Sequence, residues 1–108
     1  IEMTPIKLDN GIAIGVSVKY PKTTLLSITT QAGYIMCGVL NVEGIDKLHK
    51  DRCIVAARVT NVRNFEDMLN ATVIEATRQA QILGIIPGLT TGRQALELML
   101  LSYETIAL

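Results

Sequence analysis

A turn signal between two predicted strands constrains the fold of this chain more than any other feature. The segment Asp9-Asn10-Gly11 separates residues 4–8 from residues 12–19. Asn-Gly is favoured where a tight hairpin needs positive φ at both central positions. In residues 12–19, large apolar side chains alternate with Ala, Gly, Ser and Lys, which is the period of two of a half-buried strand. We therefore expect an N-terminal β-hairpin with one face against a core.

Further turn signals divide the next part of the chain into strands. A turn at residues 31–33 separates a third predicted strand, 24–30, from a fourth, 34–40. Asn41 is placed to cap a short helix that extends to about residue 50. The β-branched residues of segment 53–59 then predict a buried fifth strand.

The pattern becomes helical after the fifth strand. Asn64 is a suitable cap for a short helix that ends at residue 69. The segment Thr72-Val73-Ile74-Glu75 has the spacing of a capping box, which predicts a helix that ends at Leu83-Gly84. A last helix is expected from about Thr91 to about Leu101.

These elements predict one α+β domain over residues 1–108. We expect two layers: a mostly antiparallel sheet of about five strands, formed by an N-terminal β-meander, a short crossover helix and a fifth strand, with the C-terminal helices on one face. Since 49% of the residues are hydrophobic, a second sheet face without cover would leave much apolar surface. We therefore expect a homo-oligomer.

Composition argues against several kinds of partner and cofactor. Ten basic residues balance ten acidic ones and only four residues are aromatic, so the chain lacks both the basic surface and the stacking groups of a nucleic-acid-binding domain. No apolar run reaches the roughly 18 residues of a membrane span. Cys37, Cys53 and His49 have no metal-ligand spacing. We expect reduced thiols and neither a metal nor a cofactor.

The start of the last predicted helix is the first candidate site. Thr91 and Gln94 fit a capping box, which by itself explains these residues structurally. Gly92 and Arg93 between them add a functional hypothesis. A glycine lets a ligand approach the helix N-terminus, and an arginine supplies a planar fork for a carboxylate or phosphate.

Cys37 and Arg58 are candidates within predicted strands. Alternation groups Cys37 with Ile35 on the more apolar side, which is typical of a packed thiol rather than a nucleophile, although a bulge at Gly38 would re-aim the side chain. Arg58 interrupts an apolar strand, which is costly for an unpaired charge. It pairs with a carboxylate such as Glu43 or Asp46, lies in a subunit interface, or lines a ligand pocket.

Six segments together resemble the YunC-like family, a family of domains of unknown function. They are Thr4-Pro5-Ile6, Pro21-Lys22-Thr23, Gly33-Tyr34-Ile35-Met36-Cys37-Gly38, Ala57-Arg58-Val59, Leu83-Gly84-Ile85 and Gly92-Arg93-Gln94-Ala95-Leu96. The resemblance implies a small α/β fold in a prokaryotic cytoplasm and supplies no mechanism. It carries over Cys37 and Arg93 as site candidates without roles. Asn41 and Gln94 stand where this pattern leads us to expect acidic residues.

Three functional hypotheses follow. The first is a homo-oligomeric binding or regulatory domain that holds a small anionic ligand near Gly92 and Arg93, with Arg58 contributing from the sheet. The second is a thiol-dependent enzyme that uses Cys37, for which the sequence places no base. The third is a structural interaction domain that binds another protein and has no ligand pocket.

Overall fold

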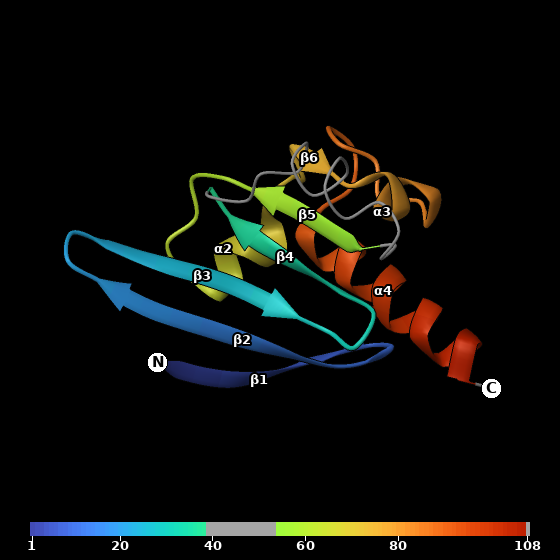
Figure 1. Ribbon diagram of the computed structural model, residues 1–108, viewed down its shortest axis with the longest axis horizontal. Coiled ribbons are helices and arrows are strands. Elements are labelled where there is room, and N and C mark those ends of the chain that lie inside the picture. The colour runs from blue at the N-terminus through green and yellow to red at the C-terminus, as the bar shows by residue number, and fades with distance from the viewer. Residues whose placement is uncertain (39–53, 108) are drawn as a thin grey trace.

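A six-stranded sheet organises the part of the chain that the computed structural model describes, residues 1–38 and 54–107 (Figure 1). The strands lie in sequence order, β1-β2-β3-β4-β5-β6, and all neighbours are antiparallel except β4 and β5, which are parallel. Their bounds are Glu2–Leu8, Gly11–Tyr20, Thr23–Thr29, Gly33–Cys37, Val55–Val59 and Glu75–Ala76. The predicted α+β class and β-meander are therefore confirmed, and the sheet gains the two-residue strand β6.

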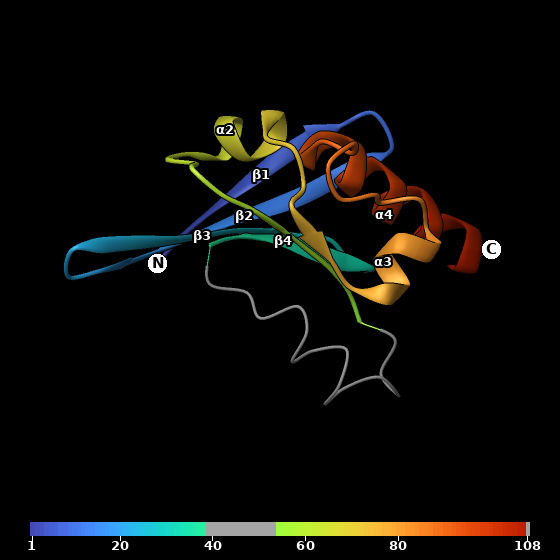
Figure 2. The ribbon, with the colours of Figure 1, turned by 90° about the horizontal axis from the view of Figure 1, so that it is seen from above.

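Three helices belong to the described residues: α2 (Phe65–Asn70), α3 (Arg78–Ile82) and α4 (Gly92–Ala107). Helices α2 and α4 lie on the same face of the sheet (Figure 2), as predicted for the C-terminal helices. None of the helices described is long and apolar enough to cross a membrane. The helix expected at residues 41–50 falls outside the described residues.

Local capping signals placed two of these helices correctly and misplaced one. The Asn64 side chain accepts the Asp67 N–H at 2.7 Å and caps α2 as expected. The capping box expected to begin at Thr72 is wrong, because α3 begins at Arg78 after the N-cap Thr77. The predicted end is correct: Leu83 caps the helix and Gly84 follows with φ +104°, a value that favours glycine.

Thr77 is the cap because its side chain joins the helix to the sheet. Its hydroxyl donates to the Ile54 carbonyl at 2.7 Å and accepts the Ala56 N–H at 3.1 Å and the Ala80 N–H at 3.3 Å. Thr77 is fully buried, so each of these polar groups needs a partner within the protein. A local capping pattern at Thr72 cannot compete with a cap that also makes two bonds to a distant segment, at Ile54 and Ala56.

The face of β2 that meets the core is the one with small side chains. Ala13 is fully buried, whereas Ile12 is 61% exposed. Phe65 of α2 lies over Gly15 so closely that a Cβ atom there would approach the ring within 2.8 Å. Small residues on this strand make room for the helical layer, while the larger β-branched side chains lie on the opposite face.

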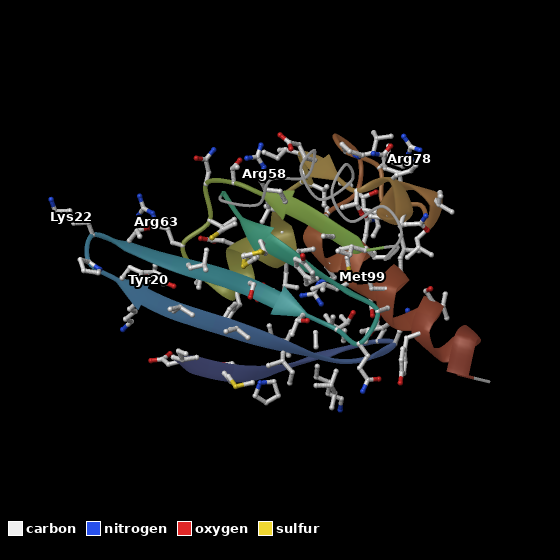
Figure 3. The ribbon with its side chains drawn as sticks, in the orientation of Figure 1. Tyr20, Lys22, Arg58, Arg63, Arg78 and Met99 are labelled. Atoms are coloured by element: carbon white, nitrogen blue, oxygen red, sulfur yellow. The ribbon has the colours of Figure 1, made fainter. Side chains whose placement is uncertain are left out.

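The main core fills the space between the sheet and the helices. Met99 extends from α4 into it (Figure 3) and is fully buried, as are Ile28 and Ile35 from the sheet. Burying a side chain of this size contributes roughly 1.5–3 kcal/mol. A smaller cluster on the other face surrounds Ala56 and contains Tyr34, Met36 and Ile54.

The predicted β1–β2 hairpin is present, but its turn differs from the expected type. Leu8 pairs with Gly11, so Asp9 and Asn10 are the two central residues. The only described non-glycine residues with positive φ are Lys22 and Asn61, which rules out positive φ at both central positions. Gly11 follows the turn with φ +150°.

Candidate functional site

The beginning of α4 is a capping box, as predicted. The Thr91 hydroxyl accepts the Gln94 N–H at 3.2 Å, and the Gln94 side-chain oxygen accepts the Thr91 N–H at 3.0 Å. The Gly92 N–H donates to the Ala71 carbonyl at 2.8 Å. Because three N–H groups at this end have protein partners, little of the helix N-terminus is available to bind an anion.

Packing accounts for the glycine at position 92. Gly92 is buried, and a Cβ atom there would overlap the Met68 carbonyl and lie 3.2 Å from the Ile35 side chain. Only a residue without a side chain lets α4 approach α2 this closely. The glycine at position 92 is thus explained by the contact of α4 with α2, without a ligand.

Arg93, one residue later, is exposed and lines a pocket of about 490 Å³, called the Arg93 pocket here. This volume is within the range of small-molecule sites. Among the described residues, the Arg93 side chain has no ion-pair or hydrogen-bond partner. The polar lining consists of Asp9, Asn10, Thr90, Arg93, Gln94 and Glu97, and Leu98 and Leu101 supply apolar surface.

Glu97 is in the Arg93 pocket but does not pair with Arg93. Residues four positions apart on a helix are neighbours, and opposite charges at this spacing usually attract. Here the Glu97 carboxylate instead accepts the Asp9 N–H at 3.1 Å and the Asn10 N–H at 3.0 Å. The β1–β2 turn thereby engages the carboxylate, and the guanidinium of Arg93 remains unpaired.

Sequence reasoning did not identify Asp9, Asn10 or Glu97 as members of the Arg93 pocket. The turn and the helix were both predicted, but no local pattern connects two segments that lie 87 residues apart. The one available signal was the spacing of Arg93 and Glu97, which indicates a shared helix face.

Cys37 ends β4 at the edge of a second pocket. Its side chain is half-buried and packs against the main core, in which Ile35 is fully buried. The β3–β4 pairing stops at Met36, and the Cys37 sulfur accepts the Leu26 N–H at 3.2 Å.

The Cys37 pocket, lined also by Tyr20, Thr23, Thr60 and Asn61, has a volume of about 440 Å³. No charged side chain of the described residues lines it. A thiol can be reached from this pocket, but the part of the chain described here supplies no acid or base beside it.

Arg58 lies across the strand pair from Glu75 of β6, and the two side chains form an ion pair. Its guanidinium also donates to the Gly38 carbonyl at 3.3 Å. The buried Nε atom has no hydrogen-bond partner in the described part of the chain. The suggested partners Glu43 and Asp46 fall outside the described residues.

The three sequence candidates are not brought together in one pocket. Arg93 and Cys37 line different pockets, and Arg58 lines neither of them. Figure 3 shows Arg58 beside β5, whereas Lys22 and Arg63 lie toward the far end of the β2–β3 hairpin. Within residues 1–38 and 54–107, no group of three His, Cys, Asp or Glu side chains is arranged to hold a metal ion.

Comparison with known proteins identifies the family. Residues 36–99 match the model of a family described as a domain of unknown function, DUF1805. The uncharacterized protein YunC of Bacillus subtilis strain 168 is 38% identical over 96 residues, which is 89% of this chain and 94% of YunC. The crystal structure of TA1206 from Thermoplasma acidophilum, a protein of unknown function, superposes with a TM-score of 0.80 at 32% identity, covering 91% of each chain. The chain therefore belongs to the DUF1805 family, in agreement with the YunC-like pattern of its sequence.

Proposed function

We propose that this chain is a homo-oligomeric binding domain that holds a small anionic ligand in the Arg93 pocket. The observation that supports the proposal is an exposed guanidinium, without a protein partner among the described residues, on the wall of a 490 Å³ pocket. Planar guanidinium groups form paired, charge-assisted hydrogen bonds with carboxylates and phosphates. Arg58 is no longer part of this hypothesis, because Glu75 already neutralises it.

Titration of the intact protein with inorganic phosphate, and with straight-chain monocarboxylates from acetate to hexanoate, tests this ligand site. The readout is the NMR chemical shift of the backbone amides at positions 93 and 94. We expect saturable shifts in the wild-type protein and a Kd at least about tenfold weaker in Arg93→Ala. The melting temperature of this variant should hardly change, because the side chain is exposed.

The matched control removes a positive charge elsewhere. Arg63 is exposed and does not line the Arg93 pocket, so Arg63→Ala should bind these anions like the wild-type protein. Equal weakening by both variants would reduce the effect to nonspecific charge attraction. Loss of stability together with binding in Arg93→Ala would favour a purely structural role in the cap.

Self-association is proposed to involve the open face of β1 and β2. Met3 and Ile12 on this face are 69% and 61% exposed, and Ile14, Val16 and Val18 beside them are only partly buried. Adjacent large apolar side chains of this kind are typical of surfaces that associate.

The free edge of β1 is a poor alternative interface, because Pro5 lies in the middle of the strand. A two-residue turn makes Leu8–Gly11 a hydrogen-bonded pair, so the alternating register makes Pro5–Ile14 a non-hydrogen-bonded pair. The N–H groups of Met3, Lys7 and the residue between them at position 5 would point outward, and the middle one is missing because it is a proline. Pairing with the edge of another sheet is disfavoured there.

Light scattering tests the proposed face. The wild-type protein should be an oligomer at micromolar concentration, and Ile12→Lys should shift it toward the monomer. Glu2→Lys, which adds the same charged group on the opposite face of the hairpin, is the control and should leave the oligomer unchanged. A wild-type monomer would contradict this part of the proposal.

A second candidate function, a thiol-dependent enzyme, is favoured by one observation. Cys37 lines a pocket of about 440 Å³ instead of being enclosed in the core. An enzyme of this type needs a group that activates the sulfur, and alkylation kinetics distinguish such a thiol from a packed one.

A further inference from the structure

The Arg93 pocket contains unpaired charges of both signs. The Glu97 carboxylate, one helical turn from Arg93, is directed to the Asp9 and Asn10 N–H groups, and this leaves the guanidinium without an ion pair. Asp9 is exposed in the same pocket, and its carboxylate has no ion-pair partner among the described residues. The protein thus maintains a cation and an anion around one cavity without joining them.

This charge arrangement discriminates against ligands of a single sign. An ion that carries only negative charge is attracted by Arg93 and repelled by the carboxylates of Asp9 and Glu97. An ion that carries only positive charge is attracted by the two carboxylates and repelled by Arg93. A molecule with one group of each sign can pair with both the guanidinium of Arg93 and the carboxylate of Asp9.

The two side-chain amides that line the pocket each have one end already bonded within the protein. The Gln94 oxygen accepts the Thr91 N–H, so its NH₂ group is left as a donor in the pocket that Arg93 also lines. The Asn10 NH₂ group donates to the Glu97 carbonyl at 3.2 Å, so its oxygen is left as an acceptor in the pocket that Asp9 also lines. The pocket thus offers one neutral donor and one neutral acceptor in addition to the guanidinium and the carboxylate.

We propose that the ligand of the Arg93 pocket is an amphoteric small molecule with an anionic group and an ammonium group. The inference rests on the proposed function and specifies its ligand class. The anionic group binds Arg93 and the Gln94 amide, and the ammonium group faces Asp9 and the Asn10 oxygen. Leu98 offers apolar surface for a short methylene chain between the two groups.

A series of ω-amino acids, from glycine to 6-aminohexanoate, scans the separation between the two charges. Each is compared with the monocarboxylate of the same chain length, by titration of the intact protein monitored through the Arg93 and Gln94 amides. We expect at least one amino acid to bind about tenfold more tightly than its matched acid. Asp9→Asn should remove this advantage and leave the affinity for the acid unchanged or higher.

Asp9→Asn removes the negative charge and changes little else. Asparagine suits a turn, and the backbone N–H of residue 9 can still donate to Glu97. Glu2→Gln, on an exposed residue of β1 outside the pocket, is the control and should preserve the preference for the amino acid. If the acids bind as tightly as the matched amino acids, the inference is wrong while the proposed anion site stands. If neither series binds, both are wrong.

Discussion

Asn10 donates to Glu97 twice, from its backbone N–H to the carboxylate and from its side-chain amide to the backbone carbonyl. With the third bond from the Asp9 N–H, this contact attaches the first hairpin turn to the last helix. Glu97→Gln replaces one acceptor oxygen with an NH₂ group that faces a donor, and the negative charge is lost. We expect the free energy of unfolding to fall by about 1–2 kcal/mol, measured by urea denaturation.

Glu2→Gln provides the reference for this prediction, because it removes an exposed carboxylate from a strand and should change stability by less than about 0.5 kcal/mol. Equal effects of the two variants would mean that the Glu97 bonds contribute nothing beyond net charge.

Gly92→Ala should be among the most destabilising single substitutions in the chain. The added methyl group would overlap the Met68 carbonyl, and backbone cannot move aside as a flexible side chain can. We expect a loss of about 3 kcal/mol or more. Thermal denaturation in the absence of any ligand measures it.

Gly88→Ala is the matched comparison. Gly88 has φ +87° but nothing within 4 Å of a built Cβ atom, so only backbone strain of about 1–2 kcal/mol applies. Similar losses for the two variants would argue that conformation, not the approach of α4 to α2, requires the glycine at position 92.

Thr77→Val tests the join between α3 and the sheet. The substitution preserves the shape of the side chain but leaves the Ile54 carbonyl and the Ala56 and Ala80 N–H groups without their partner. We expect a loss of about 2–4 kcal/mol. Thr77→Ser, which keeps the hydroxyl and deletes one methyl group, should cost only about 1 kcal/mol.

Cys37 should react with iodoacetamide more slowly than an unfolded peptide thiol. The sulfur is half-buried and accepts the Leu26 N–H, so the reagent must approach through the adjoining pocket. Peptide mass spectrometry separates its labelling from that of Cys53. A native rate above the rate in urea would indicate an activated thiol and favour the thiol-enzyme candidate.

The elements that the sequence predicted correctly depend on neighbours in the chain. Asn64 and Thr91 cap helices through groups three residues away, and the β1–β2 hairpin was recognised from its turn and the alternation of the segment that follows it. Family membership was also accessible, because it depends on a combination of short motifs along most of the chain.

The features that the sequence did not predict depend on distant partners. β6 exists because two residues pair with β5, and Thr77 replaces Thr72 as a cap because its hydroxyl reaches Ile54 and Ala56. The ion pair of Arg58 with Glu75 and the hydrogen bond from the Asn10 N–H to the Glu97 carboxylate also join segments that are distant in sequence. Which face of β2 is buried was decided by the space that Phe65 requires over Gly15.

The hydrogen bonds that Asp9 and Asn10 in the first turn make to Glu97 in the last helix affect folding during synthesis. The Asn10 N–H leaves the ribosome 87 residues before Glu97, the residue that accepts it. Until then the meander has neither this acceptor nor the apolar side of α4 against its inner face. Contacts of such long sequence separation slow folding, and the part of the sheet's core surface that α4 covers is exposed until that helix has been translated.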